Sequence, residues 1–330
     1  MMEISTLIIG AGKIAAGLDS PVTDAVLTHA HAYQQNTKTK LLGFFDSNPE
    51  AAISAAQKWG GDPFFDLEKT LAKHRPEIIS ICTPPSTRLG IIKNILKYPP
   101  KVIFLEKPLA SNLEEAKEIV SLITEASIPC LVNYSRRFDL TMQRLSSRIK
   151  SNQFGTFQTG AIFYAKGIKN NGSHLINLMQ FLVGDIASYD VTGGLADFSE
   201  DDYSLEMKLN FSAGGAVHFH PLNENNYSVI EILLYFESAK IHIRQFGLQY
   251  AICEKRADPV FQGYYDLDDQ APFLRTEYEQ AFSQAVKNIV DHIENKTEMV
   301  SSLEEAFVTE KNVHDIYSTF LFNKARATGK

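Results

Sequence analysis

The chain has 330 residues, of which 44% are hydrophobic and 22% are charged, and its formal net charge at pH 7 is −7. At about 150 residues per domain, this length predicts two domains. The acidic excess argues against a nucleic-acid partner, because such binding needs clustered Lys and Arg. Cys82, Cys130 and Cys253 form neither a zinc pattern nor a disulfide framework, so we expect no structural metal and a cytoplasmic location. Only a short apolar run follows Glu3, so neither a signal peptide nor a membrane partner is expected.

Short apolar runs alternate with helical stretches up to about residue 130. Such runs are typical of strands that are buried on both faces of a parallel sheet. Helix caps are expected at Asn48-Pro49, at Asp66 and at Ser111 or Asn112, and Gly60-Gly61 should end the first of these helices. The alternation predicts a doubly wound Rossmann sheet in residues 1–130. Its strands are expected at 6–9, 40–45, 77–82, 102–105 and 128–132.

The hydrophobic pattern changes to a period of two beyond about residue 154. Leu205, Met207, Leu209 and Phe211 alternate with polar residues, as do Ile241 and Ile243. With turns expected at 193–194, 214–215 and 237–239, this pattern predicts an antiparallel sheet with one covered face. Helices are expected again at 277–295 and 302–321, with Ser301 or Ser302 as a cap. Residues 131–330 are therefore predicted to form a second domain, and the fold class is α/β plus α+β.

The first predicted strand leads directly into Gly10-Ala11-Gly12-Lys13-Ile14-Ala15, which reads G-x-G-x-x-A. Gly10 permits a tight turn, Gly12 lets the backbone approach a pyrophosphate, and Ala15 lets the following helix pack closely. The free N–H groups of that helix should face the phosphates. We therefore expect Gly10, Gly12, Lys13 and Ile14 to bind a dinucleotide, although a plain structural turn is the alternative.

Asp46 ends the second predicted strand, where a carboxylate can accept both ribose hydroxyls and would repel a 2′-phosphate. This favours NAD over NADP. Asp46 stands 36 residues after Gly10, against about 20 in the simple fingerprint. We attribute the excess to an inserted loop at 19–23 before a helix at 24–35. The alternative is that Asp46 is a solvated turn residue beside Asn48-Pro49.

Two polar segments follow predicted strands on the ligand-binding edge of the sheet. They are 82–87, with the sequence CTPPST, and Glu106-Lys107-Pro108. Thr83 and Pro84 are expected to contact the cofactor. The lysine would place an amine in the cleft, whereas an exposed turn is the alternative.

With these segments in this order, the chain resembles the Gfo/Idh/MocA oxidoreductase family, named for glucose-fructose oxidoreductase and inositol dehydrogenase. The resemblance covers nearly the whole chain. It implies a Rossmann domain, a second domain with a large, mostly antiparallel sheet, and an active site in the cleft between them. It also implies final helices that pack back near the first domain, and a homodimer or homotetramer formed through the open sheet face. The resemblance rests on GAGKIA at 10–15, FFDSNPEAA at 44–52, CTPPST at 82–87, LEKPLA at 105–110, NYSRRFD at 133–139 and NNGSHLIN at 170–177.

Members of this family mostly oxidise or reduce a secondary alcohol or ketone of a sugar, a cyclitol or a related small molecule. The resemblance places Lys107 beside the nicotinamide, where it could stabilise an alkoxide, and makes Glu106 a contact of the cofactor or of the lysine. His174 is the candidate acid/base, because imidazole titrates near neutrality. Many members carry Asp where this chain has Asn170 and Asn177, and an amide can orient a hydroxyl or the carboxamide but cannot transfer a proton. This departure argues against inositol or glucose as the substrate. A surface lysine and a buried structural histidine are the alternatives.

Three further residues are candidates for substrate binding. Tyr164 and Lys166, in a stretch similar to members associated with surface-polysaccharide synthesis, could bind sugar hydroxyls or an anionic group. A solvated strand end is the alternative for both residues. Arg137 could contact a carboxylate or phosphate. These residues suggest a sugar or nucleotide-sugar substrate. His218 and His220 share one strand face, but no third ligand stands at a telling distance, so no metal site is expected.

The leading hypothesis is an NAD(P)-dependent oxidoreductase acting on a sugar or sugar derivative. An NAD-dependent glycosidase on the same fold would keep the lysine and the cofactor without net redox change. A non-catalytic dinucleotide-binding sensor is the third alternative, and the amide at residue 170 gives it some weight.

Overall fold

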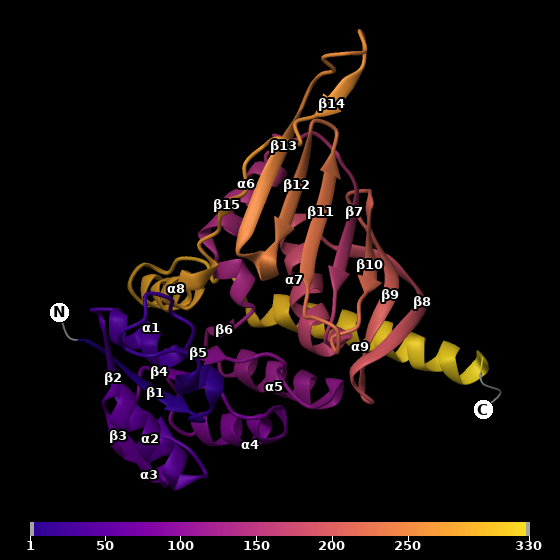
Figure 1. The fold of residues 1–330 in the computed structure, drawn as a ribbon. Helices are drawn as coiled ribbons and strands as arrows, with labels where there is room; N and C mark the ends of the chain where they lie inside the picture. The colour runs from indigo at the N-terminus through magenta and orange to yellow at the C-terminus, as the bar shows by residue number, and fades with distance from the viewer. Residues whose placement is uncertain (1–2, 328–330) are drawn as a thin grey trace. The chain divides into compact units, whose positions relative to one another are not determined.

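A computed structural model describes residues 3–327 of the chain, which divide into two compact units (Figure 1). The first unit contains the chain up to Asp139 together with Glu279–Glu310. The second contains Leu140–Tyr278 and the chain from Lys311 onward. Helix α9 therefore contributes its first residues to one unit and the remainder to the other.

The first unit contains a six-stranded parallel sheet with the strand order β3-β2-β1-β4-β5-β6. This is the doubly wound order, which confirms the predicted Rossmann sheet. All five predicted strands are present. The additional edge strand β3 has only three residues and follows two glycines, so it gave no periodic signal. The strands are β1 Ile4–Ile9, β2 Thr39–Phe45, β3 Asp62–Phe64, β4 Ile78–Ile81, β5 Val102–Leu105 and β6 Cys130–Val132.

The period of two along these strands divides their side chains between the two faces of the sheet. Leu7, Ile79 and Ile103 lie on one face, in a cluster that also contains residues of α3, α4, α5 and the start of α9. Ser80 and Phe104 contact α1 on the other face. The helical segments of this unit are η1 Lys13–Gly17, α1 His29–Gln35, α2 Pro49–Trp59, α3 Leu67–His74, α4 Pro85–Ile95, α5 Leu113–Glu125, η2 Ser135–Phe138, α8 Ala281–Asn295 and the first part of α9 Leu303–Ala327.

Local capping explains where most of these helices begin. The predicted caps at Asn48, Asp66 and Asn112 are present. Their side-chain oxygens accept hydrogen bonds from backbone N–H groups at the starts of α2, α3 and α5. Gly60, with φ +83°, ends α2. Ser302 caps α9 in a reciprocal arrangement with Glu305, which identifies the second of the two serines that the sequence offered.

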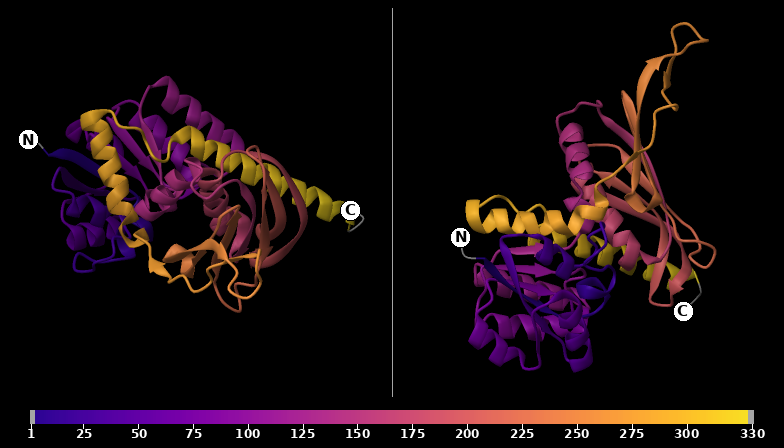
Figure 2. Two further views of the ribbon diagram at one scale, coloured as in Figure 1. Left: turned by 90° about the horizontal axis from the view of Figure 1, so that it is seen from above. Right: turned by 60° about the vertical axis from the view of Figure 1, so that its left-hand side comes forward.

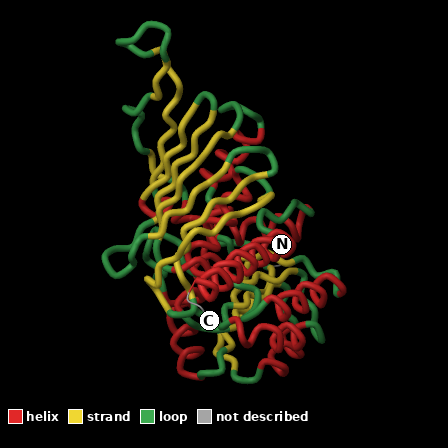
Figure 3. Tube along the Cα trace, turned by 90° about the vertical axis from the view of Figure 1, so that its right-hand side faces the viewer, coloured by secondary structure: helices red, strands yellow, loops and turns green. Residues whose placement is uncertain are grey.

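The second unit contains a nine-stranded sheet, most of which runs in the order β14-β13-β12-β11-β7-β10-β9-β8, with β15 paired to β13. The pairing of β7 with β10 is parallel and the others are antiparallel, so the sheet is mostly antiparallel, as expected. Its strands lie side by side in Figure 3, and the β13–β14 hairpin extends beyond the others (Figure 2). The strands are β7 Phe157–Tyr164, β8 Ile186–Ser199, β9 Asp202–Phe211, β10 Ala216–Pro221, β11 Ile230–Phe236, β12 Ala239–Arg244, β13 Gln249–Ala257, β14 Tyr265–Leu267 and β15 Leu274–Arg275.

One face of this sheet is covered by helices. The alternating apolar residues of β9 and β12 are buried in a core with residues of α6, α7 and the later part of α9. The turns at 214–215 and 237–239 are confirmed. The turn expected at Gly193-Gly194 is wrong, because both glycines lie inside β8 at a shift in its register with β9. A Cβ on Gly194 would lie 2.7 Å from the Phe320 ring, so close packing of α9 explains this glycine. The helical segments are α6 Leu140–Lys150, η3 Gly167–Gly172, α7 Ser173–Leu182, η4 Gln245–Gly247 and the later part of α9, and η5 Tyr278–Gln280 spans the boundary between the units.

Candidate active site

The glycine-rich turn directly follows β1. Gly10 has φ +93°, and a Cβ there would lie 2.9 Å from the backbone of both Cys82 and Thr83. The close approach of the end of β4 therefore requires glycine at this position. At Gly12, by contrast, a Cβ would meet nothing within 4 Å. The turn thus combines a tight backbone contact with open space where a phosphate group fits.

The segment after the turn is shorter than predicted. Lys13–Gly17 forms a single π-helical turn of five residues, with Lys13 exposed and Ile14 half-buried. The regular helix expected directly after the turn is therefore replaced by five residues, which carry little of the dipole of a full helix. The regular helix expected at 24–35 begins only at His29, where Thr28 caps it.

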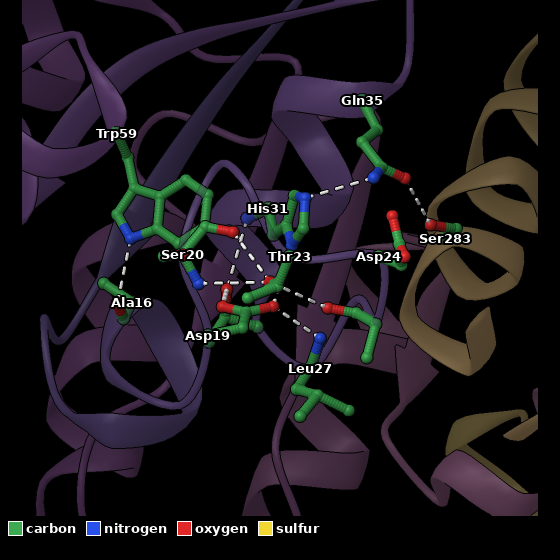
Figure 4. A network of polar contacts seen from close by, with 12 residues as sticks. Ala16, Asp19, Ser20, Thr23, Asp24, Leu27, His31, Gln35, Trp59 and Ser283 are labelled. Atoms are coloured by element: carbon green, nitrogen blue, oxygen red, sulfur yellow. Dashed lines mark hydrogen bonds and ion pairs between the residues drawn. The ribbon is translucent and has the colours of Figure 1, made fainter. Parts of the chain in front are cut away.

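A buried network holds the loop between η1 and α1 (Figure 4). The Asp19 carboxylate accepts hydrogen bonds from Leu27 N at 2.6 Å, Thr28 Oγ1 at 2.6 Å and His31 Nδ1 at 2.9 Å. The Trp59 indole donates to the carbonyl of Ala16 at 2.8 Å. These contacts satisfy a buried carboxylate with three donors, so the inserted loop has a defined conformation beside the turn.

Asp46 links the end of β2 to the glycine-rich turn. Its Oδ2 accepts Ala11 N–H at 2.7 Å, and its Oδ1 accepts Asn48 N–H at 2.8 Å. A carboxylate has about four acceptor positions, so both oxygens can still accept ribose hydroxyls. The buried Thr83 Oγ1, after β4, has no hydrogen-bond partner among the described residues. The open space at Gly12, the acceptors of Asp46 and this unpaired hydroxyl fit a bound NAD molecule.

Arg88 fixes the backbone at the carboxyl ends of β4 and β5. Its guanidinium, exposed by 3%, donates to the carbonyl of Thr83 through Nε at 3.0 Å and Nη2 at 2.8 Å. Its Nη1 donates to the carbonyls of Glu106 and Pro108. Both residues that flank Lys107 are therefore held by one buried side chain, and Lys107 itself is half-buried.

The Glu106 side chain continues the alternation of β5 and points to the face that α1 covers. Its Oε1 accepts hydrogen bonds from His29 Nε2 at 2.8 Å and Asn133 Nδ2 at 2.6 Å. Burial by itself would raise the pKa of Glu106, but the hydrogen bonds from His29 and Asn133 and the charge of Arg88 outweigh it. The pKa of Glu106 consequently lies below its usual value, and the carboxylate stays ionised at neutral pH.

A second carboxyl group lies near Lys107. Glu310 of α9 accepts the Leu109 N–H. Burial raises the pKa of Glu310 to about 7, although this hydrogen bond and the charges of Arg88 and Lys107 act in the opposite direction. The segment that carries Lys107 therefore has one carboxyl group that is ionised at pH 7 and another that titrates there.

In the second unit, the candidates Asn170 and His174 follow β7. The Asp202 carboxylate accepts Lys169 N–H at 2.8 Å and Asn170 N–H at 3.0 Å. Asn170 lies in the π-helical turn η3, whereas half-buried His174 lies in the first turn of α7. The predicted regular helical face through 170, 174 and 177 is therefore interrupted, and Asn177 is exposed by only 1%. Of these three side chains, those of Asn170 and His174 keep partly exposed surface.

The first part of the chain matches a known protein family. Residues 4–134 match the Gfo/Idh/MocA model, which describes an oxidoreductase family with an NAD-binding Rossmann fold. Over this range, which contains the Rossmann sheet, the chain is similar to the Gfo/Idh/MocA family. The protein is therefore an oxidoreductase that uses NAD as its cofactor, as the sequence predicted.

Individual relatives show how varied this group is. Inositol 2-dehydrogenase of Rhizobium meliloti (strain 1021) is 21% identical over 330 residues, which cover 91% of this chain and 92% of that protein. The WlbA dehydrogenase from Bordetella pertussis, in complex with NADH and UDP-GlcNAcA, has a TM-score of 0.78 at 17% identity over 98% of this chain and 96% of that one. The super-repressor mutant of Gal80p from Saccharomyces cerevisiae has a TM-score of 0.79 at 12% identity over 97% of both chains. The two structural matches establish a common fold.

Two residues predicted to bind the substrate are buried in the structure. The Tyr164 ring is fully buried and its hydroxyl donates to the carbonyl of Leu205 at 3.0 Å, so it is a core residue. Arg137 is exposed by 2% and forms a 2.6 Å ion pair with Glu305. It therefore joins η2 to the start of α9. In both cases sequence indicated a polar group but not its burial.

Lys166 remains a substrate-binding candidate. It adopts φ +75°, and its side chain is 39% exposed, with Nζ 3.9 Å from a Glu224 oxygen and 5.4 Å from the centre of the Phe198 ring. The structure was also searched for metal ligands. Within residues 3–327 no group of three His, Cys, Asp or Glu side chains could hold a metal ion. No helix in that range is long and apolar enough to cross a membrane.

Sequence reasoning missed the residues that support the candidates. Arg88, His29 and Asn133 reach Glu106 or its backbone from α4, α1 and the end of β6. The alternation of β5 could have shown that Glu106 points to the same face as Phe104. It could not have shown that His29 lies there, because 77 residues separate the two partners.

Proposed function

We propose that this protein transfers a hydride between NAD and a secondary alcohol or ketone of a sugar derivative. The observation that carries the proposal is the position of Lys107. It follows β5 in the same parallel sheet whose β1 leads into the glycine-rich turn, and Arg88 holds the backbone on both sides of it. In such sheets, ligands bind outside the carboxyl ends of the strands.

The chain's residues then have distinct roles. NAD, when bound, supplies or accepts the hydride. Gly10, Gly12, Lys13, Ile14, Asp46, Thr83, Pro84 and Glu106 hold the cofactor. Lys107 donates a hydrogen bond to the reacting oxygen and stabilises the developing alkoxide. His174 takes or returns the hydroxyl proton, and Asn170 orients a substrate hydroxyl. Lys166 binds an anionic group of the substrate.

A nucleotide sugar is the first substrate class to test. Of the three similar proteins named above, one is named for inositol and another was crystallised in complex with UDP-GlcNAcA. Lys166 is a partly exposed cation that suits a phosphate or carboxylate. The amides at 170 and 177 set this chain apart from the family pattern with two aspartates, which also favours a substrate other than inositol.

The first experiment measures thermal stabilisation by NAD, NADH, NADP and NADPH in parallel. A ligand at 100 times its Kd adds about 2.7 kcal/mol, so binding is easily detected. We expect NAD and NADH to stabilise the protein most, because Asp46 repels a 2′-phosphate. A larger response to NADP(H) would overturn the role of Asp46.

The second experiment follows NADH formation with UDP-sugars, hexoses and inositols. Lys107→Ala should lower the rate by about 1,000-fold or more and leave NAD affinity within a few-fold. Lys93→Ala is the matched control, because Lys93 is an exposed lysine paired with Glu118. Activity that survives in the Lys107 variant would exclude the catalytic role.

One alternative is a non-catalytic dinucleotide sensor, which the amide at residue 170 favours because it cannot transfer a proton. A sensor would bind NAD but convert no sugar in the panel. A glycosidase would release sugar products without accumulating NADH. NADH formation identifies the oxidoreductase, and chromatography of the same reaction mixtures distinguishes a glycosidase, which releases sugar, from a sensor, which does not.

We also propose that the protein forms a homodimer or homotetramer through the face of the second sheet opposite α6, α7 and the later part of α9. Phe163, Leu233 and Tyr235 alternate with the buried residues of β7 and β11 and remain half-buried. Analytical ultracentrifugation of the wild type and Tyr235→Glu tests this proposal: an oligomer that the substitution dissociates supports it. A cytoplasmic location remains a prediction from the three free cysteines.

A further inference from the structure

Four buried polar side chains form a hydrogen-bond network beneath the carboxyl end of β5: those of Glu106, His29, Ser80 and Tyr33. His29 Nε2 lies 2.8 Å from Glu106 Oε1, and His29 Nδ1 lies 3.1 Å from Ser80 Oγ. Ser80 Oγ is in turn 2.7 Å from the Tyr33 hydroxyl. None of the four residues is more than 7% exposed. An apolar side chain would fill the place of His29 without the cost of burying polar atoms, so the histidine calls for a functional explanation.

The positions of the protons determine which group donates in each of these hydrogen bonds. Burial raises the pKa of Tyr33 well above its usual value, so its hydroxyl keeps the proton and can donate to Ser80. The Ser80 hydroxyl can then donate to His29 Nδ1, which leaves Nε2–H to donate to Glu106. The other neutral tautomer would set the Nε2 lone pair against a carboxylate oxygen. The hydrogen-bond network therefore makes His29 a donor to Glu106.

Glu106 is consequently held through one of its two oxygens. His29 and Asn133 both donate to Oε1, while Oε2 receives no hydrogen bond from residues 3–327. The other titratable groups that face Glu106 are the Arg88 guanidinium and the Cys82 thiol. Burial and the Glu106 charge raise the pKa of Cys82, so this thiol stays neutral. Glu106 is thus a fixed negative charge with one oxygen left for a ligand.

The order of the strands indicates which part of NAD would meet this charge. The pyrophosphate belongs at the turn after β1, and the ribose that Asp46 would bind belongs at the end of β2. Because the order is β2-β1-β4-β5, the other half of the dinucleotide extends toward β4 and β5. That half carries the nicotinamide ring, which is positively charged when oxidised and neutral when reduced.

We propose that His29 is a positioning residue that keeps Glu106 ionised and oriented, and that the pair thereby makes the protein bind NAD⁺ in preference to NADH. The inference rests on the proposed cofactor site, but it concerns a different property, the ratio of two affinities. His29 touches neither substrate nor cofactor and acts only through Glu106. Its removal leaves Glu106 buried with fewer donors, which raises the pKa of the carboxyl group.

The test compares the dissociation constants of NAD⁺ and NADH by calorimetry between pH 6 and 9. Glu106→Gln should shift their ratio toward NADH about fivefold to tenfold at every pH, because it removes the charge permanently. His29→Leu should give a similar shift at pH 6 that disappears as the pH rises and Glu106 ionises again. A general packing defect would not produce this recovery.

Two conservative variants keep the test decisive if His29→Leu folds poorly. The Gln amide nitrogen can take the position of Nε2, whereas an Asn amide is too short to reach Glu106. His29→Gln should therefore keep the wild-type ratio, and His29→Asn should lose it. His31→Leu is the matched control, since His31 is an equally buried histidine of α1 that pairs with Asp19.

Each outcome separates this inference from the proposed function. If the wild type binds both cofactors but His29→Leu and His29→Asn keep the wild-type ratio at all pH values, the role of His29 is overturned and the cofactor site stands. The same holds if His31→Leu shifts the ratio as strongly. If the wild type binds neither cofactor, the proposed function fails and this inference fails with it.

Discussion

The two segments that carry the catalytic candidates are held in opposite ways. In the first unit, the buried cation Arg88 donates to three backbone carbonyls around Lys107. In the second unit, the buried anion Asp202 accepts backbone N–H groups of the turn before His174. Both arrangements leave the candidate side chains to other contacts. One buried charge can therefore fix the backbone of an irregular segment that carries a candidate catalytic residue.

The largest effect should come from Arg88→Lys, which keeps the charge but loses the planar set of donors. Three backbone carbonyls lose charge-assisted hydrogen bonds from a buried guanidinium, so we expect a loss of about 3–5 kcal/mol of unfolding free energy. Urea denaturation measures the loss. A change below about 0.5 kcal/mol would show that Arg88 does not hold the Lys107 segment.

The matching change in the second unit is Asp202→Asn. One carboxylate oxygen becomes an NH₂ group that faces a backbone N–H, and we expect a loss of about 2 kcal/mol. The same denaturation experiment applies, with Asp201→Asn as the control because Asp201 is exposed. Equal losses in both variants would contradict the role of Asp202.

The pH dependence of stability tests whether an ionised Glu310 near the Lys107 segment stabilises the fold. Its pKa of about 7 exceeds the ordinary value of 4.5, so the folded state binds the proton more tightly than the unfolded state. The contribution of Glu310 to stability therefore falls as the pH rises from about 4.5 to 7.

Glu310→Gln removes this titration. The variant should match the wild type at about pH 4 and exceed it by about 1 kcal/mol at about pH 8, a figure reduced to allow for partial exposure. Thermal denaturation at several pH values measures the difference. A wild type that gains stability relative to the variant as the pH rises would contradict a raised pKa for Glu310.

The smallest effect on stability should come from Asn170→Asp, because the substitution keeps the size of the side chain and leaves in place the backbone N–H that Asp202 accepts. We expect a change in unfolding free energy within about 0.5 kcal/mol and an altered rate or substrate range. Steady-state kinetics on the accepted sugar and on the other sugars of the panel measures the rate and the substrate range. Unchanged kinetics would remove Asn170 from the substrate site.

Predictions that rest on local signals were mostly confirmed. Asn48, Asp66 and Gly60 act within a few residues of themselves, so their roles could be inferred without the fold. The exceptions are informative. The π-helical turns after Gly12 and Lys166 replace the regular helices that the same motifs predicted. Hydrophobic periodicity does not distinguish one irregular turn from the start of a helix.

The sequence by itself determined the doubly wound Rossmann sheet, the family resemblance and the segments that carry Gly10, Asp46 and Lys107. These follow from apolar runs, caps and motifs, which act over short distances along the chain. The tertiary structure alone decided that Tyr164 is a core residue and that His29 is the partner of Glu106. The physical reason is that burial and pairing depend on which segments meet in space, and 77 residues separate the members of that pair.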